Sequence, residues 1–239
     1  MNDFIEQFRK QKDLLSWVKQ ELDRIDAHCS FTFFSHLGDQ NACSMSENDR
    51  MMSLTADTLN RRLHLAFSDR GVYIGDLYCN SIDQAIAAIL RFLSHRDSTS
   101  AMRQNVPGYT PTEIADEHEE GAAAEVRVAW LGVLNFFEQV YPHGIPLATY
   151  LRNREPYANM FPTKSWDCIC FSRCTGYPFT TDGPVIRPLT EERAQICDFQ
   201  GNMLFEGSNA EVIEALKEFT PADWTHASQG NCETYMNYK

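Results

Sequence analysis

The chain has 239 residues, of which 43% are hydrophobic and 23% are charged, with 12 glycines and 10 prolines. This is ordinary globular composition, and it excludes disordered, collagen-like and coiled-coil chains. The 21 lysines and arginines stand against 33 aspartates and glutamates, which gives a formal net charge of -12. That charge has the wrong sign for binding a phosphate backbone, so we expect no direct nucleic-acid partner and favour a basic protein as partner.

The cysteines are predicted to be free thiols in a reducing compartment. The N-terminal residues show no uninterrupted apolar stretch after their charges, so no signal peptide is predicted. No apolar stretch approaches the roughly 20 residues of a membrane span. We therefore expect a cytoplasmic protein without disulfides, although it has eight cysteines. They are Cys29, Cys43, Cys79, Cys168, Cys170, Cys174, Cys197 and Cys232.

The first half of the chain predicts a helix and then a β-β-α unit. Apolar residues recur at helical spacing between Phe4 and Leu22, and the unit follows after a β-rich segment. The β-rich segment is Ser30 to Ser35, and the unit consists of a hairpin of Arg62 to Asp69 with Val72 to Leu77 and a helix that runs to His95. The pair Ser81 and Gln84 predicts a capping box at the start of that helix.

A second β-β-α unit is predicted near the C-terminus. Its strands are Arg193 to Phe199 and Met203 to Glu206, and a capping box at Ser208 and Glu211 opens a helix through Phe219. Aligning Ser81 with Ser208 superimposes several apolar positions of the two helices. Internal duplication would produce that match, and so would the ordinary chemistry of a capped amphipathic helix.

The middle of the chain predicts a linker, a helix pair and a strand. Residues 96–112 are rich in Ser, Asn, Pro and Gly and are interpreted as the linker. The acidic run Asp116 to Glu120 is interpreted as the start of a long helix from Gly121, because carboxylates suit the positive end of a helix dipole. Trp130 and Phe137 lie on its apolar stripe and are predicted to be buried. A shorter helix at Pro146 to Arg154 and a strand at Asp167 to Arg173 follow.

These elements predict an α+β fold in which two antiparallel β-β-α units pack with a central helix pair. The expected domains are residues 1–112, with the N-terminal helix and the first unit, and residues 113–239, with the central helices and the second unit. One continuous globule is the alternative.

Polar and reactive side chains gather in the stretch SWDCICFSRCTGYPFTTDGPVIRP, residues 165–188. Three segments of the chain resemble a bacterial family of unknown function. They are this stretch with the preceding FPTK, the segment HEEGAAAEVRVAW and, more loosely, GVYIGDLYCNSIDQAIAAIL. Genome pipelines label members of this family as natural product biosynthesis proteins. The resemblance runs from about Arg61 to Phe219 and implies no catalytic residues, because the family has no established activity. It draws attention to His118-Glu119, Phe161-Pro162 and Phe171-Ser172-Arg173.

The candidate ligand-binding or partner-binding residues are polar side chains from two places in the sequence. They are His118, Glu119, Ser172, Arg173, Cys174, Thr175 and Asp182. Cys174 beside Arg173 could act as a thiolate with His118 as its base. No oxyanion-hole or nucleophile-elbow signature flanks Cys174, so a turn thiol is the better interpretation. Arg173 is interpreted as the partner of a carboxylate, and Asp182 as part of a turn.

Familiar catalytic and ligand motifs are missing from the sequence. His118-Glu119 is not followed by the second histidine of H-E-x-x-H, since position 122 is Ala122. Cys168 and Cys170 lack the second ligand pair of a zinc site, and no phosphate-binding loop occurs. No metal and no cofactor are therefore predicted. The tail from Trp224 to Tyr238 carries aromatic residues without a period, and either packs on the domain or offers a partner surface.

Two functions from different classes fit the sequence. The first is a bacterial immunity protein that binds a toxin effector and occludes its active site, because an acidic surface is attracted to a basic cleft. The alternative is an accessory enzyme of small-molecule biosynthesis that uses the Arg173-Cys174 turn. We favour the immunity protein, since no base, nucleophile and oxyanion donor occur in a recognisable arrangement.

Overall fold

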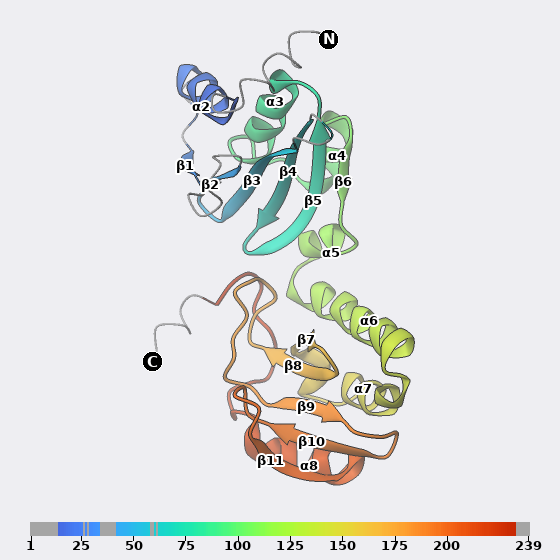
Figure 1. Cartoon of the computed structure of the whole chain (residues 1–239). Coiled ribbons are helices and arrows are strands. Elements are labelled where there is room, and N and C mark those ends of the chain that lie inside the picture. The colour runs from blue at the N-terminus through green and yellow to red at the C-terminus, as the bar shows by residue number, and fades with distance from the viewer. Residues whose placement is uncertain are drawn as a thin grey trace. The chain divides into compact units, whose positions relative to one another are not determined.

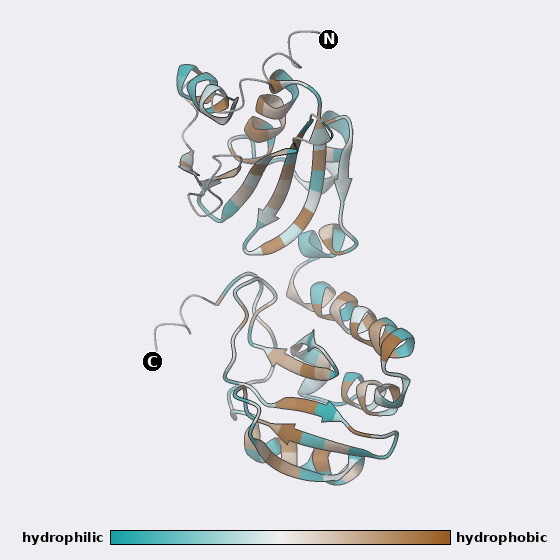
Figure 2. Ribbon diagram, in the orientation of Figure 1, coloured by the Kyte–Doolittle hydropathy of each residue, from teal (hydrophilic) through white to brown (hydrophobic). Residues whose placement is uncertain are grey.

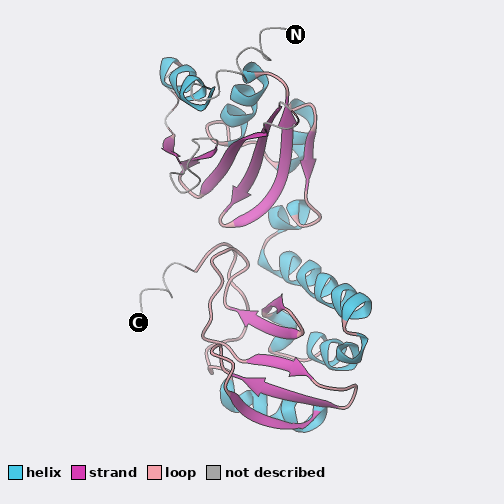
Figure 3. Ribbon diagram, in the orientation of Figure 1, coloured by secondary structure: helices cyan, strands magenta, loops and turns pink. Residues whose placement is uncertain are grey.

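The computed structural model describes residues 14–25, 27, 29–33, 42–57, 60 and 62–232. The chain divides into two units, Met1–Glu119 (unit 1) and Glu120–Lys239 (unit 2), and each contains one antiparallel sheet (Figure 1). Seven α-helices and eleven strands lie within the described ranges (Figure 3), which confirms the predicted α+β class. No helix in these ranges is both long and apolar enough to cross a bilayer.

Unit 1 is built on a six-stranded sheet whose strands are ordered as they occur in the chain. All neighbours are antiparallel, so short connections suffice between β1 and β5. The strands are β1 (Ser30–Phe33), β2 (Ala42–Glu47), β3 (Arg50–Asp57), β4 (Arg62–Asp69), β5 (Val72–Cys79) and β6 (Tyr109–Pro111). The predicted hairpin is β4 and β5.

Helix α3 (Ile82–Phe92) supplies much of the helical side of the unit 1 core. The Ser81 hydroxyl accepts a hydrogen bond from the Gln84 amide and caps the helix, which is one half of the predicted capping box. The Gln84 side chain donates instead to the Pro107 carbonyl. The buried residues of α3 recur every three or four positions, and Phe92 meets Phe67 of β4 edge to face at 5.1 Å. Apolar and polar residues are interspersed along β5 (Figure 2), and Val72, Ile74, Leu77 and Cys79 join this core. A β-bulge in the pairing with β4 moves the buried positions from even to odd numbers. Helix α2 (Leu14–Arg24) adds Val18 and Leu22.

The predicted linker at residues 96–112 is wrong, because it forms α4 (Thr99–Asn105) and β6. Ser98 caps α4, Gly108 adopts a φ of +88°, and β6 pairs with β5. The residues that resembled a linker therefore mark the ends of these elements. Met102 and Tyr109 are buried in the unit 1 core.

The interpretation of the acidic run Asp116 to Glu120 as the start of the long helix is also wrong. The run forms a separate helix, α5 (Ala115–Glu120), and not the first turn of the long helix. Gly121 separates the two helices with a φ of +108°, a conformation that favours glycine. The long helix is α6 (Ala122–Val140).

Unit 2 places a five-stranded sheet against three helices. The sheet order is β11-β10-β9-β8-β7, and all neighbours are antiparallel. The strands are β7 (Phe161–Ser165), β8 (Cys168–Ser172), β9 (Val185–Pro188), β10 (Arg193–Cys197) and β11 (Met203–Ser208), and the helices are α6, α7 (Ile145–Arg152) and α8 (Asn209–Phe219). Apolar residues of all three helices and of one sheet face form one core. The predicted β-β-α unit is β10, β11 and α8, and Ser208 and Glu211 form the complete capping box.

The two ends of the chain are described in part. Of the predicted helix at residues 4–22, the part before Leu14 lies outside the described residues, as do Tyr235 and Tyr238 of the tail. Trp224 is buried in the unit 2 core, so the described part of the tail packs on its own unit.

Trp130 and Phe137 are 1% and 0% exposed, which confirms the predicted stripe of α6. The Trp130 ring meets Phe171 of β8 at 6.0 Å between centroids. We expect Trp130→Ala to lower the free energy of unfolding by about 3–5 kcal/mol, because it leaves a cavity between helix and sheet. Urea denaturation measures this, with the exposed neighbour Leu131→Ala as control. Equal losses for the two variants would contradict this packing.

Candidate functional site

The structure divides the seven predicted site residues between the two units. His118 and Glu119 lie on α5 of unit 1, and the other five lie at the end of β8 and in the following loop of unit 2. The five in unit 2 form one cluster around Ser172 and Arg173, described below. The two groups are therefore considered separately.

His118 belongs to a buried network of charges. Its side chain is 2% exposed, its Nε2 lies 2.9 Å from Nη2 of Arg70, and the same nitrogen lies 3.5 Å from Oδ2 of Asp69. Arg50 approaches Asp69 at 3.5 Å and donates a hydrogen bond to the Phe92 carbonyl. These contacts attach α5 to the β4–β5 hairpin, and Arg50 attaches β3 to α3. Glu119 also contributes to this attachment, since its carboxylate accepts a hydrogen bond from the Thr99 amide.

Asp69 is charged in this network. Burial alone would raise its pKa, but the hydrogen bond from His118 and the charges of Arg50 and Arg70 outweigh burial and hold the pKa below its ordinary value. A depressed carboxylate pKa stabilises the fold above the unfolded-state pKa of about 3.9. This stabilisation is lost as the pH falls through the folded-state pKa.

We therefore expect Asp69→Asn to lower the free energy of unfolding by about 3 kcal/mol at pH 7, because it leaves the buried guanidinium of Arg50 and the half-buried guanidinium of Arg70 without their carboxylate. The difference in the free energy of unfolding between the variant and the native protein should shrink at pH 3. There Asp69 of the unfolded native chain is mostly protonated, so its charge contributes less to the stability of the native protein. Urea titrations at the two pH values test this. A difference that is independent of pH would show that the charge of Asp69 is not involved.

Ser172 is the centre of the turn that ends β8. Its hydroxyl oxygen accepts hydrogen bonds from the amides of Cys174 at 3.1 Å and Thr180 at 3.3 Å, and it donates to the Cys174 carbonyl at 2.8 Å. The Thr180 hydroxyl in turn accepts a hydrogen bond from the Arg173 amide at 2.9 Å. A single buried side chain thus joins the strand end to the loop that contains Thr180.

Arg173 clamps two loops from different parts of unit 2. Its guanidinium bonds Asp182 at 2.9 Å and Asp223 at 2.7 Å, and it lies 4.6 Å from the ring of Trp224. The expected carboxylate partners of Arg173 are therefore Asp182 and Asp223. Sequence reasoning named Asp182 but did not pair it with Arg173. Gly183 lies so close that a Cβ there would be 2.5 Å from the Trp224 ring.

Cys174 is not a free thiol, because it forms a disulfide with Cys232. Their Cα atoms are 5.8 Å apart, and the two residues are 58 positions apart in the chain. The tail returns to the end of β8, where the Thr175 amide donates to the Ser228 carbonyl and the Gly230 amide donates to the Thr175 hydroxyl. The prediction of eight free thiols is wrong for this pair, since the sequence gives no sign that the tail packs here. The other six cysteines are free.

We expect the unfolded, unreduced protein to contain six titratable thiols, and eight after reduction. The double variant Cys174→Ser/Cys232→Ser should lose about 2–4 kcal/mol of stability, because the unfolded chain is no longer cross-linked. The control is Cys29→Ser, at a half-buried free thiol. This variant retains the disulfide, so reduction should still lower its free energy of unfolding. Eight thiols before reduction, or a double variant as stable as the native protein, would contradict the disulfide.

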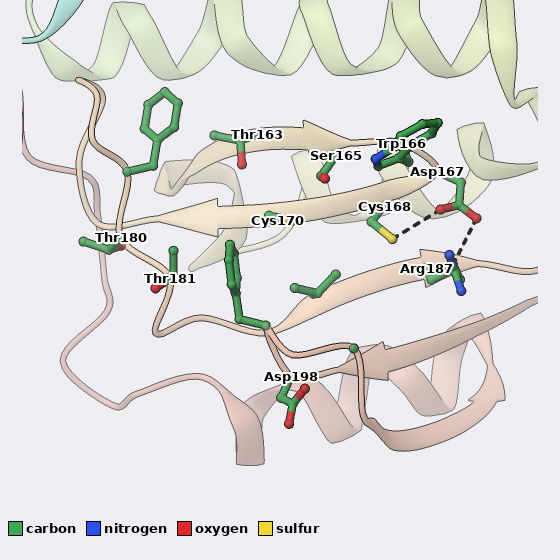
Figure 4. A pocket seen from close by; sticks show the side chains of 14 residues that line it. Thr163, Ser165, Trp166, Asp167, Cys168, Cys170, Thr180, Thr181, Arg187 and Asp198 are labelled. Atoms are coloured by element: carbon green, nitrogen blue, oxygen red, sulfur yellow. Dashed lines mark hydrogen bonds and ion pairs between the residues drawn. The ribbon is translucent and has the colours of Figure 1, made fainter. Parts of the chain in front are cut away.

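A pocket lies on the sheet face that points away from the helices of unit 2 (Figure 4). Ile169, Ile186 and Ile196 face the helices, so their neighbours along each strand point to the opposite face. The pocket has a volume of about 310 Å³. Its floor consists of strand residues with mostly small side chains, namely Thr163, Ser165, Cys168, Cys170, Val185 and Arg187. Cys168 and Cys170, two positions apart on β8, therefore lie on the same sheet face.

Three turns and loops form the walls of the pocket. Trp166 and Asp167, the turn of the β7–β8 hairpin, lie at one end, and Thr180 and Thr181 lie at the other (Figure 4). Phe199, after β10, adds a third part of the lining. Thr180 is the residue that Ser172 and Arg173 hold. The predicted site residues of unit 2 therefore position one wall of the pocket and do not line it themselves.

The thiols in the pocket are held in their neutral form. Burial raises the pKa of Cys168 to about 12, with a further contribution from Asp167, and burial raises the pKa of Cys170 to about 11. Asp167 forms an ion pair with Arg187 at 3.0 Å and accepts a hydrogen bond from the Cys168 thiol at 3.4 Å. A protonated thiol is a poor nucleophile. The floor therefore suits binding better than covalent chemistry.

Trp166 is conformationally unusual. It is the first residue of a two-residue hairpin turn, its φ is +55°, and its side chain is 82% exposed. A left-handed conformation costs an L-residue about 1–2 kcal/mol, and such turn positions usually hold glycine or asparagine. Phe199 is also 54% exposed. Sequence reasoning missed both residues, because Trp166-Asp167 is not one of the glycine- or asparagine-containing pairs that signal a two-residue hairpin turn.

Residues 149–231 match a family of unknown function, DUF6193. The matched region contains every residue that lines the pocket and the Ser172–Thr175 turn. No curated protein and no solved structure matches the chain. The family carries no assigned activity, so the functional argument depends on the site itself.

Proposed function

We propose that the chain is an immunity protein. It binds the basic surface at the active site of a toxin effector and neutralises the toxin by blocking that site. The observation that carries the proposal is the pocket on the open face of the unit 2 sheet. It combines neutral thiols on its floor and an ion pair between its floor and one wall with exposed aromatic residues at its edge. Exposed aromatic side chains beside a pocket are typical of surfaces that bind proteins.

The charge of the chain supports a basic partner. The net charge of -12 attracts a positively charged surface and accelerates association at low ionic strength. A toxin that acts on an anionic substrate would bind it in a cationic cleft, and an acidic inhibitor would compete for the same surface. The proposed reaction of the chain is therefore association alone, without turnover of a substrate.

The alternative is an accessory enzyme of small-molecule biosynthesis, as the label of the resembling family implies. That function would use Cys174 beside Arg173. The disulfide withholds Cys174 from catalysis, and the guanidinium of Arg173 already contacts two carboxylates. These contacts favour a structural role for the turn, and we therefore prefer the binding function.

Co-expression with a candidate toxin effector tests the proposal. The native chain should restore growth and co-purify with the toxin. Replacing the exposed Glu138 and Glu218 with lysine should slow association and make it less sensitive to salt, whereas replacing both with glutamine should have a smaller effect. Consumption of a small-molecule substrate, or protection without a complex, would contradict the proposal.

A further inference from the structure

Trp166 and Phe199 expose large apolar surfaces that the core of unit 2 does not use. They come from different turns, and both line the pocket. The left-handed conformation of Trp166 makes the turn less favourable, and its side chain gains little burial in return. We infer that Trp166, Phe199 and the pocket receive one apolar side chain of the toxin, from a segment that carries a basic residue beside it. This inference rests on the proposed function.

The size of the pocket favours one side chain. Its volume of about 310 Å³ lies at the lower end of the 300–1,000 Å³ range of ligand pockets. The small side chains of Thr163, Ser165 and Cys170 leave a shallow floor, and aromatic walls can contact a ring inserted above it. An aromatic anchor in a pocket of this kind is the usual form of a binding hot spot.

The charges on this sheet face favour a basic neighbour. Arg187 is paired with Asp167 at 3.0 Å, and Arg193 is paired with Glu206 at 2.8 Å. Asp198 lines the pocket and makes no ion pair among the described residues. Hydrogen bonds from Asn202 hold its pKa below the ordinary value, so it stays charged at neutral pH. Carboxylates therefore exceed cations at the pocket, which attracts a lysine or arginine near the inserted side chain.

Short peptides test this chemistry without the toxin. We would titrate the full chain with N-acetyl-Arg-Phe-amide and follow the backbone amides by NMR. Shifts should concentrate at Ser165 to Cys168 and at Phe199 to Gly201. Affinity should fall about tenfold for N-acetyl-Arg-Ser-amide, which lacks the ring, and about threefold for N-acetyl-Gln-Phe-amide, which lacks the charge. Equal affinities, shifts elsewhere, or no shifts at millimolar peptide would overturn the inference.

Variants connect the pocket to the toxin complex. Trp166→Gly should weaken the complex at least tenfold while the melting temperature stays equal or rises, because glycine adopts a positive φ without strain. Phe199→Ala should also weaken the complex. Leu131→Ala, on an exposed part of α6, is the matched control and should change affinity less than twofold. A melting temperature lowered by Trp166→Gly would contradict the strain argument.

The two proposals can fail separately. A toxin complex that survives both Trp166→Gly and Phe199→Ala would overturn the pocket as the contact surface and leave the immunity function in place. Selective binding of the Arg-Phe peptide, with no protection and no complex in co-expression, would overturn the immunity function and leave the peptide-binding chemistry in place.

Discussion

The pocket of unit 2 depends on the turn that ends β8, where a disulfide, an arginine and a serine connect three segments. The Cys174–Cys232 disulfide fixes the C-terminal segment to the turn. Arg173 holds Asp182 and Asp223, and Ser172 holds the Thr180 amide. Because Thr180 lines the pocket, the shape of one pocket wall follows from these contacts. Cys174, Arg173 and Ser172 therefore stabilise the wall of a pocket, which is consistent with the proposed binding function.

Unit 1 shows the same use of charged residues. His118 was a candidate site residue in the sequence, but it lies buried beside Asp69 and Arg70, and this network, which also includes Arg50, attaches α5 to the sheet. A buried charge needs partners of opposite charge and hydrogen bonds, so such a cluster specifies one arrangement of the elements around it. In both units, the side chains with the most reactive chemistry are occupied by contacts within the fold.

Much of the fold was predictable because local rules determine it. Hydrophobic periodicity located α3, α6, β4, β5 and β10, and the Ser208 capping box fixed the start of α8. Long-range packing decided the rest. The short strand β9 is bounded by prolines and gives no periodic signal, and the ends of α4 and β6 resemble a linker. For the site, Ser172, Arg173 and Asp182 were named as candidates from the sequence, whereas their contacts, the disulfide partner of Cys174 and the pocket walls depend on segments far apart in the sequence.

Hydrogen exchange tests most directly whether the turn holds the pocket wall. The amides of Arg173, Thr180 and Gly176 are bonded within this arrangement, and their exchange can be compared between the native protein and the Cys174→Ser/Cys232→Ser variant under native conditions. We expect these amides to exchange faster in the variant, while the amides that pair β9 with β10 keep their protection. Unchanged exchange at Thr180 and Arg173 would contradict the account, because the wall would then be held without the disulfide.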